Sequence, residues 1–247
     1  LGRGVYHIAQ DKEKNLYIPA QDQGRIYRIT PSGQVSTFFS QPTGPCGFIG
    51  GIAIDKDGFI YASYSCTEGI IYKIHPNGRE FSIFYRNPSV GSIYGMEFDS
   101  DGSLWAVCDK DNIGSAIKIT NGITTILYRG TMISNGFAIK LDGRGNAYIP
   151  SYINQHIVKI NACGSIEVVY NGNRISYPQG IVIGESGNLY IASNFPDNAR
   201  LGNTITKLTP LGEASIFAGT GVAGSRDGSL GEASFNGPTG MFFNEVG

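Results

Sequence analysis

A pattern of four short strands recurs along this chain about every 43 residues, and this repeat constrains the fold more than any other feature. One marker is an aromatic residue within an apolar phrase, which returns every 42 to 44 residues at Tyr17, Tyr61, Trp105, Tyr148 and Tyr190. A second marker is a basic residue in the following strand, which returns every 41 to 48 residues at Arg28, Lys73, Lys118, Lys159 and Lys207. Because the two series agree, we expect five copies of one structural unit.

The second copy shows the unit most plainly. A strand over 51–55 is followed by a turn at 56–58, a strand over 59–63, a third over 70–74 and a fourth that ends at Phe84. Apolar residues alternate within these segments, and Gly, Asn, Asp and Pro separate them, as in antiparallel hairpins. No segment carries a sustained helical period, so the pattern disfavours folds that alternate strands with helices.

A ring is the arrangement that such units favour. One four-stranded sheet buries too few apolar side chains to offset the entropy of ordering it, so each sheet needs neighbours on its faces. A closed ring supplies those neighbours. Glycine suits the innermost strand, where backbones crowd around a central channel, and it recurs there at Gly51, Gly95, Gly136, Gly180 and Gly240, whereas the first copy has His7. The predicted fold is therefore an all-β propeller of four-stranded blades.

The repeat divides the chain, as one domain over 1–247, into five complete blades and part of a sixth. The predicted blades are 4–40, 47–86, 92–130, 133–171 and 177–219, and residues 237–247 are expected to add the first strand of a sixth blade. The prediction is thus a propeller of the six-bladed type. Since the chain begins with Leu1 and not with Met, we expect a processed or excised piece of a longer protein.

The glycine-rich segment near the C-terminus adds a family resemblance. Its residues Ala233, Phe235, Pro238 and Gly240, together with the phrases GIAID and GNLYIAS, resemble the NHL-repeat family of β-propellers. The resemblance covers nearly the whole chain and implies a propeller that most often has six blades. It leaves function open, because that family includes protein-binding, nucleic-acid-binding and enzymatic members.

Polar and aromatic residues are expected to gather at one rim of the ring. The first two strands of a blade are antiparallel, so the residue before the first strand and the residue after the second lie at the same end. The residues at these positions are Tyr64, Tyr94, Asp109, Asn135, Tyr152, Gln179, Asn194 and Thr239. Aromatic and amide side chains at a channel mouth are suited to binding, so this rim is the predicted functional surface.

A second and weaker resemblance concerns the same rim. The phrase Ser134-Asn135-Gly136-Phe137-Ala138 resembles the Asn-Gly phrase of the SMP-30/gluconolactonase family, six-bladed enzymes that hold a divalent metal with a Glu, an Asn and an Asp. The resemblance implies Asn135 as a ligand of Ca²⁺ or another divalent cation. Asp109 and Glu97 are available as carboxylates, although neither lies in a family motif and the Glu expected on the first inner strand is absent.

Charge and composition limit the partners. The net charge is −1 and no run of Lys or Arg occurs, so we expect no nucleic-acid partner. No apolar stretch approaches the roughly 18 residues of a membrane-spanning helix. The GxGxxG match over 219–224 is followed by a turn and not by a helix, so we expect no nucleotide cofactor.

The four cysteines are too few for a disulfide scaffold and form no CxxC pair. Cys46 and Cys66 are expected at the same end of the second blade, where a disulfide would form if the protein is exported. Cys108 and Cys163 are expected at opposite ends of different blades and unbonded. The compartment stays open, with an extracellular or secreted location favoured.

The favoured interpretation is a non-enzymatic scaffold for interaction or assembly, whose partner is a protein or another copy of the chain. No catalytic arrangement of Ser, His or Cys emerges from the spacing, and no cofactor is expected. The alternative is a divalent-metal-dependent hydrolase or lactonase with its site at the channel mouth around Asn135.

Overall fold

The computed structural model describes residues 7–20, 24–41, 49–64, 67–195 and 201–243. These residues form five antiparallel sheets of four strands, and each sheet keeps its strands in chain order. Blade 1 contains β1 (Ala9–Gln10), β2 (Leu16–Ala20), β3 (Arg25–Ile29) and β4 (Val35–Ser40). Blade 2 contains β5 (Ile49–Ile54), β6 (Ile60–Tyr64), β7 (Ile70–Ile74) and β8 (Phe81–Arg86).

The remaining three blades follow the same plan. Blade 3 contains β9 (Ser92–Phe98), β10 (Leu104–Lys110), β11 (Ile113–Thr120) and β12 (Ile123–Gly130). Blade 4 contains β13 (Lys140–Leu141), β14 (Asn146–Ser151), β15 (His156–Asn161) and β16 (Ile166–Tyr170). Blade 5 contains β17 (Pro178–Ile183), β18 (Leu189–Ser193), β19 (Thr204–Leu208) and β20 (Ala214–Ala218).

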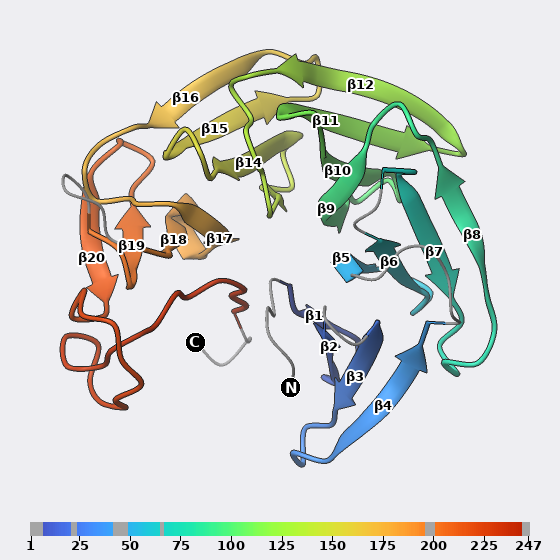
Figure 1. Ribbon diagram of the computed structural model, residues 1–247, viewed down its shortest axis with the longest axis horizontal. Coiled ribbons are helices and arrows are strands. Elements are labelled where there is room, and N and C mark those ends of the chain that lie inside the picture. Colours follow the sequence, from blue (N-terminus) through green and yellow to red (C-terminus); the bar gives the residue numbers. More distant parts are fainter. Residues whose placement is uncertain (1–6, 21–23, 42–48, 65–66, 196–200, 244–247) are drawn as a thin grey trace.

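The blades follow one another around a common centre (Figure 1). The first strand of each blade lies nearest the centre and the fourth lies at the periphery. The described residues contain no α-helix, and the short 3-10 helix η2 (Glu185–Gly187) lies in the turn between β17 and β18. None of the described residues belongs to a helix with the length and apolar character needed to cross a membrane. The predicted all-β propeller with four-stranded blades is therefore confirmed.

The two sequence markers are cross-strand partners in every blade. Tyr17 pairs with Arg28, Tyr61 with Lys73, Trp105 with Lys118, Tyr148 with Lys159, and Tyr190 with Lys207. In blade 3 this pair also makes a cation–aromatic contact, because the Lys118 amine lies 5.3 Å from the centre of the Trp105 ring. The repeat period read from the sequence is thus a period of paired side chains.

An aspartate completes this arrangement at the turn between the first and second strands. In blade 3, Asp99 accepts hydrogen bonds from the backbone N–H groups of Asp101 and Ser103, at 3.0 and 2.9 Å. Its second oxygen accepts from the Trp105 indole N–H at 2.9 Å and pairs with the Lys118 amine at 2.7 Å. One carboxylate therefore fixes the turn, the aromatic ring and the basic side chain together.

Neighbouring blades pack face to face, as the entropy argument requires. Each of the four buried apolar clusters joins residues of two consecutive blades. Glycine on the inner strand permits this approach, because a Cβ on Gly51 would overlap the carbonyl oxygen of Tyr94 in the next blade.

The fourth strand carries a β-bulge at the same place in every blade. Its register shifts by one residue against the third strand, and the extra residue is Phe38, Phe84, Leu127, Val169 or Phe217 in blades 1 to 5. In blades 1, 2 and 5 this phenylalanine packs edge-on against the second-strand tyrosine, with ring centres 4.8–4.9 Å apart.

The prediction of a six-bladed type is wrong, because the structure has five blades. The expected first strand of a sixth blade, at 237–247, is not formed over its described part, 237–243. Gly237 has a positive φ of 63°, Pro238 has no N–H to donate, and no second strand among the described residues pairs with this segment.

Residues 219–243 lie between blade 5 and blade 1 without forming a strand (Figure 1). The end of this segment covers the face of blade 5 that is turned away from blade 4. A Cβ on Gly180 would overlap the carbonyl oxygen of Thr239, and the centres of the Phe243 and Tyr190 rings lie 5.1 Å apart. Phe98 makes the equivalent contact to Tyr61, at 4.8 Å, between blades 2 and 3. An irregular segment therefore supplies the apolar cover that a neighbouring blade supplies elsewhere.

Candidate functional site

The channel-mouth rim is formed by the strand ends that the sequence argument places together. Ser92 at the start of β9 pairs with Asp109 near the end of β10, and Pro178 at the start of β17 pairs with Ser193 at the end of β18. In blade 4 an isolated bridge between Gly136 and Ser151 has the same role. Residues before first strands and after second strands therefore share one end of the ring.

Four of the predicted rim residues lie together on blades 3 and 4 and are half-buried: Tyr94, Asp109, Asn135 and Tyr152. The two tyrosines belong to a continuous row of rings. Tyr94 contacts Phe137 at 5.2 Å between ring centres, Phe137 contacts Tyr152 at 5.4 Å, and Tyr152 contacts Tyr177 at 5.1 Å. We call these four residues the aromatic row.

Sequence reasoning missed two members of the aromatic row, Phe137 and Tyr177. Phe137 directly follows the inner-strand glycine Gly136, and Tyr177 directly precedes β17. A signal was available, because an aromatic residue next to the start of an inner strand lies at the rim by the same geometry as Tyr94.

Strained backbone holds the aromatic row in place. Asn135 has φ of 49° and Tyr177 has φ of 45°, in the left-handed region that costs a non-glycine residue energy. Each follows a buried serine whose backbone N–H donates to a second-strand hydroxyl, from Ser134 to Ser151 at 2.9 Å and from Ser176 to Ser193 at 3.5 Å. The same arrangement, a serine–serine hydrogen bond followed by a left-handed residue, therefore fixes the rim at blades 4 and 5.

Asp109 lies beside the aromatic row. Its two carboxylate oxygens accept the backbone N–H groups of Asn112, at 3.2 Å, and of Asn135, at 3.3 Å. Both bonds are long, and no ion pair involves this carboxylate among the described residues. Asp109 thus adds a negative charge at the edge of an otherwise apolar row.

Three more of the eight predicted rim residues are buried, and the eighth, Thr239, is half-buried. Tyr64 is fully buried in the core between blades 1 and 2, where its ring packs edge-on against Tyr72 at 5.1 Å. Asn194 donates its side-chain amide to the Gln179 side-chain oxygen at 2.6 Å, and both residues are buried. The backbone oxygen of Asn194 accepts from the Asn203 N–H at 2.8 Å, which ties this network to the loop before β19.

The three residues considered as metal ligands do not meet. Asp109 and Asn135 are neighbours at the rim, whereas Glu97 pairs in the sheet register with Trp105, which lies four residues before Asp109 on β10 and about 13 Å away at strand spacing. Glu97 is bonded instead to the Lys140 amine at 3.2 Å and to the Leu141 N–H at 2.8 Å. Within the described ranges, no group of three or more His, Cys, Asp or Glu side chains could hold a metal ion.

At the centre of the ring, the described residues His7, Ile52, Met96, Ala138, Gly180 and Met241 line a small cavity of about 30 Å³. Burial, together with the nearby Lys140, lowers the pKa of His7 to about 4 against the raising effect of a backbone hydrogen bond with Phe137. The side chain is therefore neutral at pH 7.

The predicted disulfide between Cys46 and Cys66 falls outside the described residues. Cys108 and Cys163 are both free. Cys108 is buried, and this burial raises the pKa of its thiol, which makes it a packing residue and not a nucleophile.

The comparisons with known proteins agree on the fold alone. No protein-family model and no curated protein match the chain. Among solved structures, virginiamycin B lyase from Staphylococcus aureus is similar with a TM-score of 0.65 and 20% identity, over 87% of this chain and 69% of that chain. An auxiliary nutrient-binding protein from Bacteroides thetaiotaomicron is similar with a TM-score of 0.78 and 18% identity, over 99% of this chain and 65% of that chain.

A nidogen/laminin complex is also similar, with a TM-score of 0.72 and 16% identity over 85% of this chain and 78% of that chain. These neighbours differ in function, and every identity is below the level that carries function from one protein to another. The chain is thus a β-propeller, and the NHL resemblance remains an expectation about its family.

Proposed function

We propose that this propeller is a non-enzymatic binding module that holds a segment of a protein partner on the aromatic row. The observation that carries the proposal is the row itself, in which Tyr94, Phe137, Tyr152 and Tyr177 touch in sequence across three blades. Half-buried aromatic rings give large contact areas at a small entropy cost, which is why they anchor protein interfaces.

The surroundings of the row favour binding over chemistry. The cavity that the described residues line at the centre has a volume of about 30 Å³, so the proposal places the partner across the mouth. The left-handed residues Asn135 and Tyr177 keep the rings in position before binding, which reduces the entropy that association costs. Asp109 at the edge of the row favours a partner that places a basic side chain beside its apolar anchor.

A structural neighbour offers a precedent. One of the similar structures is a complex of nidogen with laminin, so a propeller of this shape is compatible with a protein–protein interface. At 16% identity, the precedent concerns the architecture and not the partner.

The proposal is tested by selecting random peptides from a phage-displayed library on the immobilised protein. We expect peptides that share an aromatic or apolar anchor next to Lys or Arg, and we expect Tyr94→Ala and Tyr152→Ala each to weaken their binding about tenfold. Ile123→Ala is the matched control, because Ile123 is 71% exposed on the outer strand of blade 3. Selected peptides that bind the two tyrosine variants as well as the wild type would refute the proposal.

Self-association is the competing outcome. Sedimentation velocity of the wild type and of the Tyr94→Ala/Tyr152→Ala double variant distinguishes the two. A concentration-dependent dimer that the double variant loses would identify a second copy as the occupant of the row, whereas a monomer at all concentrations supports a separate protein.

A further inference from the structure

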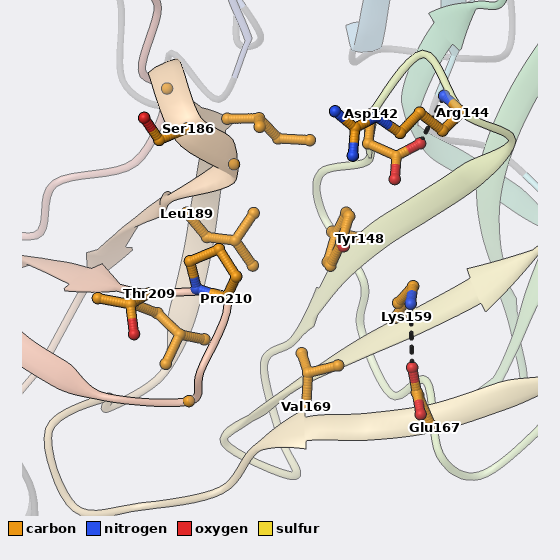
Figure 2. A pocket seen from close by; sticks show the side chains of 15 residues that line it. Asp142, Arg144, Tyr148, Lys159, Glu167, Val169, Ser186, Leu189, Thr209 and Pro210 are labelled. Carbon is orange, nitrogen blue, oxygen red and sulfur yellow. Dashed lines mark hydrogen bonds and ion pairs between the residues drawn. The ribbon is translucent and has the colours of Figure 1, made fainter.

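A groove between blades 4 and 5 opens at the rim opposite to the channel mouth, beside the turn of Asp142 and the 3-10 helix η2. It has a volume of about 580 Å³, within the range of small-molecule sites. Figure 2 shows Tyr148, Lys159 and Val169 of blade 4 on one side, and Leu189 and Pro210 of blade 5 on the other.

Two equivalent grooves of the ring are smaller. The groove between blades 3 and 4 has a volume of about 370 Å³, and that between blades 2 and 3 about 360 Å³. The bulge residue Phe84 lines the groove between blades 2 and 3, whereas the bulge residue of the larger groove is Val169. Blades 1, 2 and 5 place a phenylalanine on the second-strand tyrosine, whereas blade 4 places only Val169 near Tyr148. The groove therefore lacks the aromatic ring that blades 1, 2 and 5 provide at this position.

The outer side of the groove is open as well. The turn between the third and fourth strands of blade 4 covers the preceding groove, because a Cβ on Gly164 would overlap the carbonyl oxygen of Leu127. Gly212 is at the corresponding turn of blade 5, and a Cβ placed there would have no neighbouring atom within 4 Å. A ligand can thus enter between Val169 and the turn of Gly212.

The polar groups at the groove leave one hydroxyl and one cation available. Tyr17 and Tyr61 donate their hydroxyls to the turn aspartates of their blades, both at 3.0 Å. In blade 4 the matching Asp142 oxygen accepts the Asn146 side-chain amide at 2.7 Å, and the Tyr148 hydroxyl has no hydrogen-bond partner among the described residues.

Two cations and two carboxylates line the groove, and one of the cations has no ion-pair partner among the described residues. Lys159 is paired with Glu167 at 3.2 Å, and the Asp142 carboxylate accepts the backbone N–H groups of Arg144 and Asn146, at 2.8 and 3.1 Å. The Arg144 guanidinium forms no ion pair among the described residues. Figure 2 shows its side chain extended from blade 4 toward blade 5, above Tyr148.

We propose that this groove binds a small aromatic carboxylate. The ligand ring takes the place of the missing phenylalanine, edge-on to Tyr148 and above Val169 and Leu189, and the carboxylate lies at the Arg144 guanidinium, where two parallel N–H bonds are available. The site is independent of the aromatic row at the opposite rim, so either proposal can fail alone.

The test measures binding of phenylacetate, 3-phenylpropionate and indole-3-acetate by isothermal titration and by saturation-transfer NMR. For ligands of this size we expect dissociation constants between micromolar and millimolar. Two matched compounds separate the contribution of the carboxylate from that of the aromatic ring. Phenylacetamide lacks the charge, and cyclohexylacetate lacks the aromatic ring. Each is expected to bind about tenfold more weakly than phenylacetate.

Two variants place the ligand in this groove. Val169→Phe restores the ring that three other blades carry at this position, so it should abolish binding while the melting temperature stays at or above that of the wild type. Arg144→Gln should weaken the carboxylates about tenfold and leave phenylacetamide unchanged. Lys56→Gln, in the corresponding turn of blade 2, is the charge-matched control and should change nothing.

Two results would overturn the proposal. One is the absence of saturable binding by all three carboxylates to the wild-type protein. The other is binding that persists undiminished in the folded Val169→Phe variant, because the ligand would then occupy a different place.

Discussion

Replacing Asp99 by alanine tests the carboxylate that recurs at the first turn of the blades. The substitution leaves the Trp105 indole N–H and the Ser103 backbone N–H without acceptors, and these residues are only 1% and 2% exposed. A buried donor without a partner costs about 1–3 kcal/mol. The Asp101 N–H and the Lys118 amine can turn to water at small cost. We therefore expect Asp99→Ala to lower the free energy of unfolding by about 3–4 kcal/mol.

Asp142→Ala is the matched control in blade 4. Asp142 accepts from the backbone of Arg144 and Asn146, which are exposed or half-buried, and from no second-strand aromatic hydroxyl. Its removal should cost about 1–2 kcal/mol. Urea unfolding followed by fluorescence measures both variants, because Trp105 is the one tryptophan in the chain and contacts Asp99 directly. Equal losses in the two variants would contradict the reasoning.

The same carboxylate gives a pH signature. Burial by itself raises the pKa of Asp99, but hydrogen bonds from Lys118, Trp105 and Ser103 outweigh burial and lower the pKa below its usual value. The charged form therefore stabilises the folded protein above pH of about 4, and this contribution is lost as the pH falls through the lowered pKa. The stability difference between wild type and Asp99→Ala should shrink in that range, and a constant difference would count against a charged acceptor.

Three further perturbations address other parts of the structure. The pKa of His7 is lowered to about 4, so the unfolded chain binds a proton that the folded protein does not; urea unfolding should show a loss of up to about 3 kcal/mol between pH 6.5 and 4, which His7→Leu removes. Gly51→Ala forces a Cβ against the carbonyl of Tyr94 and should cost about 1–3 kcal/mol in thermal unfolding, whereas an unchanged melting temperature would contradict the close contact. Exposed Cys163 should react with iodoacetamide in the native protein and buried Cys108 only after unfolding, as peptide mapping by mass spectrometry would show.

The repeat made most of the fold predictable. The aromatic and basic markers are periodic because they are cross-strand partners, as Tyr61 and Lys73 are in blade 2. The third strand of that blade was predicted at 70–74 and is observed as Ile70–Ile74. Local pattern sufficed here because antiparallel hairpins pair residues that are close in sequence.

The blade count and part of the rim depended on contacts that pattern does not encode. A strand is defined by its partner, and the segment 237–243 lacks one among the described residues. Tyr64 continues the face of β6 that carries Ile60 and Ala62, and this face packs on blade 1, so the residue is buried and does not reach the rim. Its position in the sequence predicted the end of a strand. Because side chains alternate between the two faces of a strand, Tyr64 points to the face that packs on blade 1.

The groove between blades 4 and 5 could not be found from the sequence. Val169 looks like an ordinary strand residue until the register shift between Ile157 and Val158 identifies it as the bulge residue. Its significance comes from comparison with Phe84 and Phe217 at the same structural position. The alignment of blades by apolar pattern alone does not reveal which residue is unpaired.

The recurring bulge leaves one residue on the fourth strand of each blade outside the pairing with the third strand. The extra residue has no direct cross-strand partner, so its side chain can change in size without altering the hydrogen-bond ladder around it. A single codon at each of five structurally equivalent places is then enough to open or fill an individual crevice. If the groove between blades 4 and 5 binds a ligand as proposed, a substitution of the bulge residue in another blade is expected to change the space of one crevice and to leave the strand pairing of the ring in place.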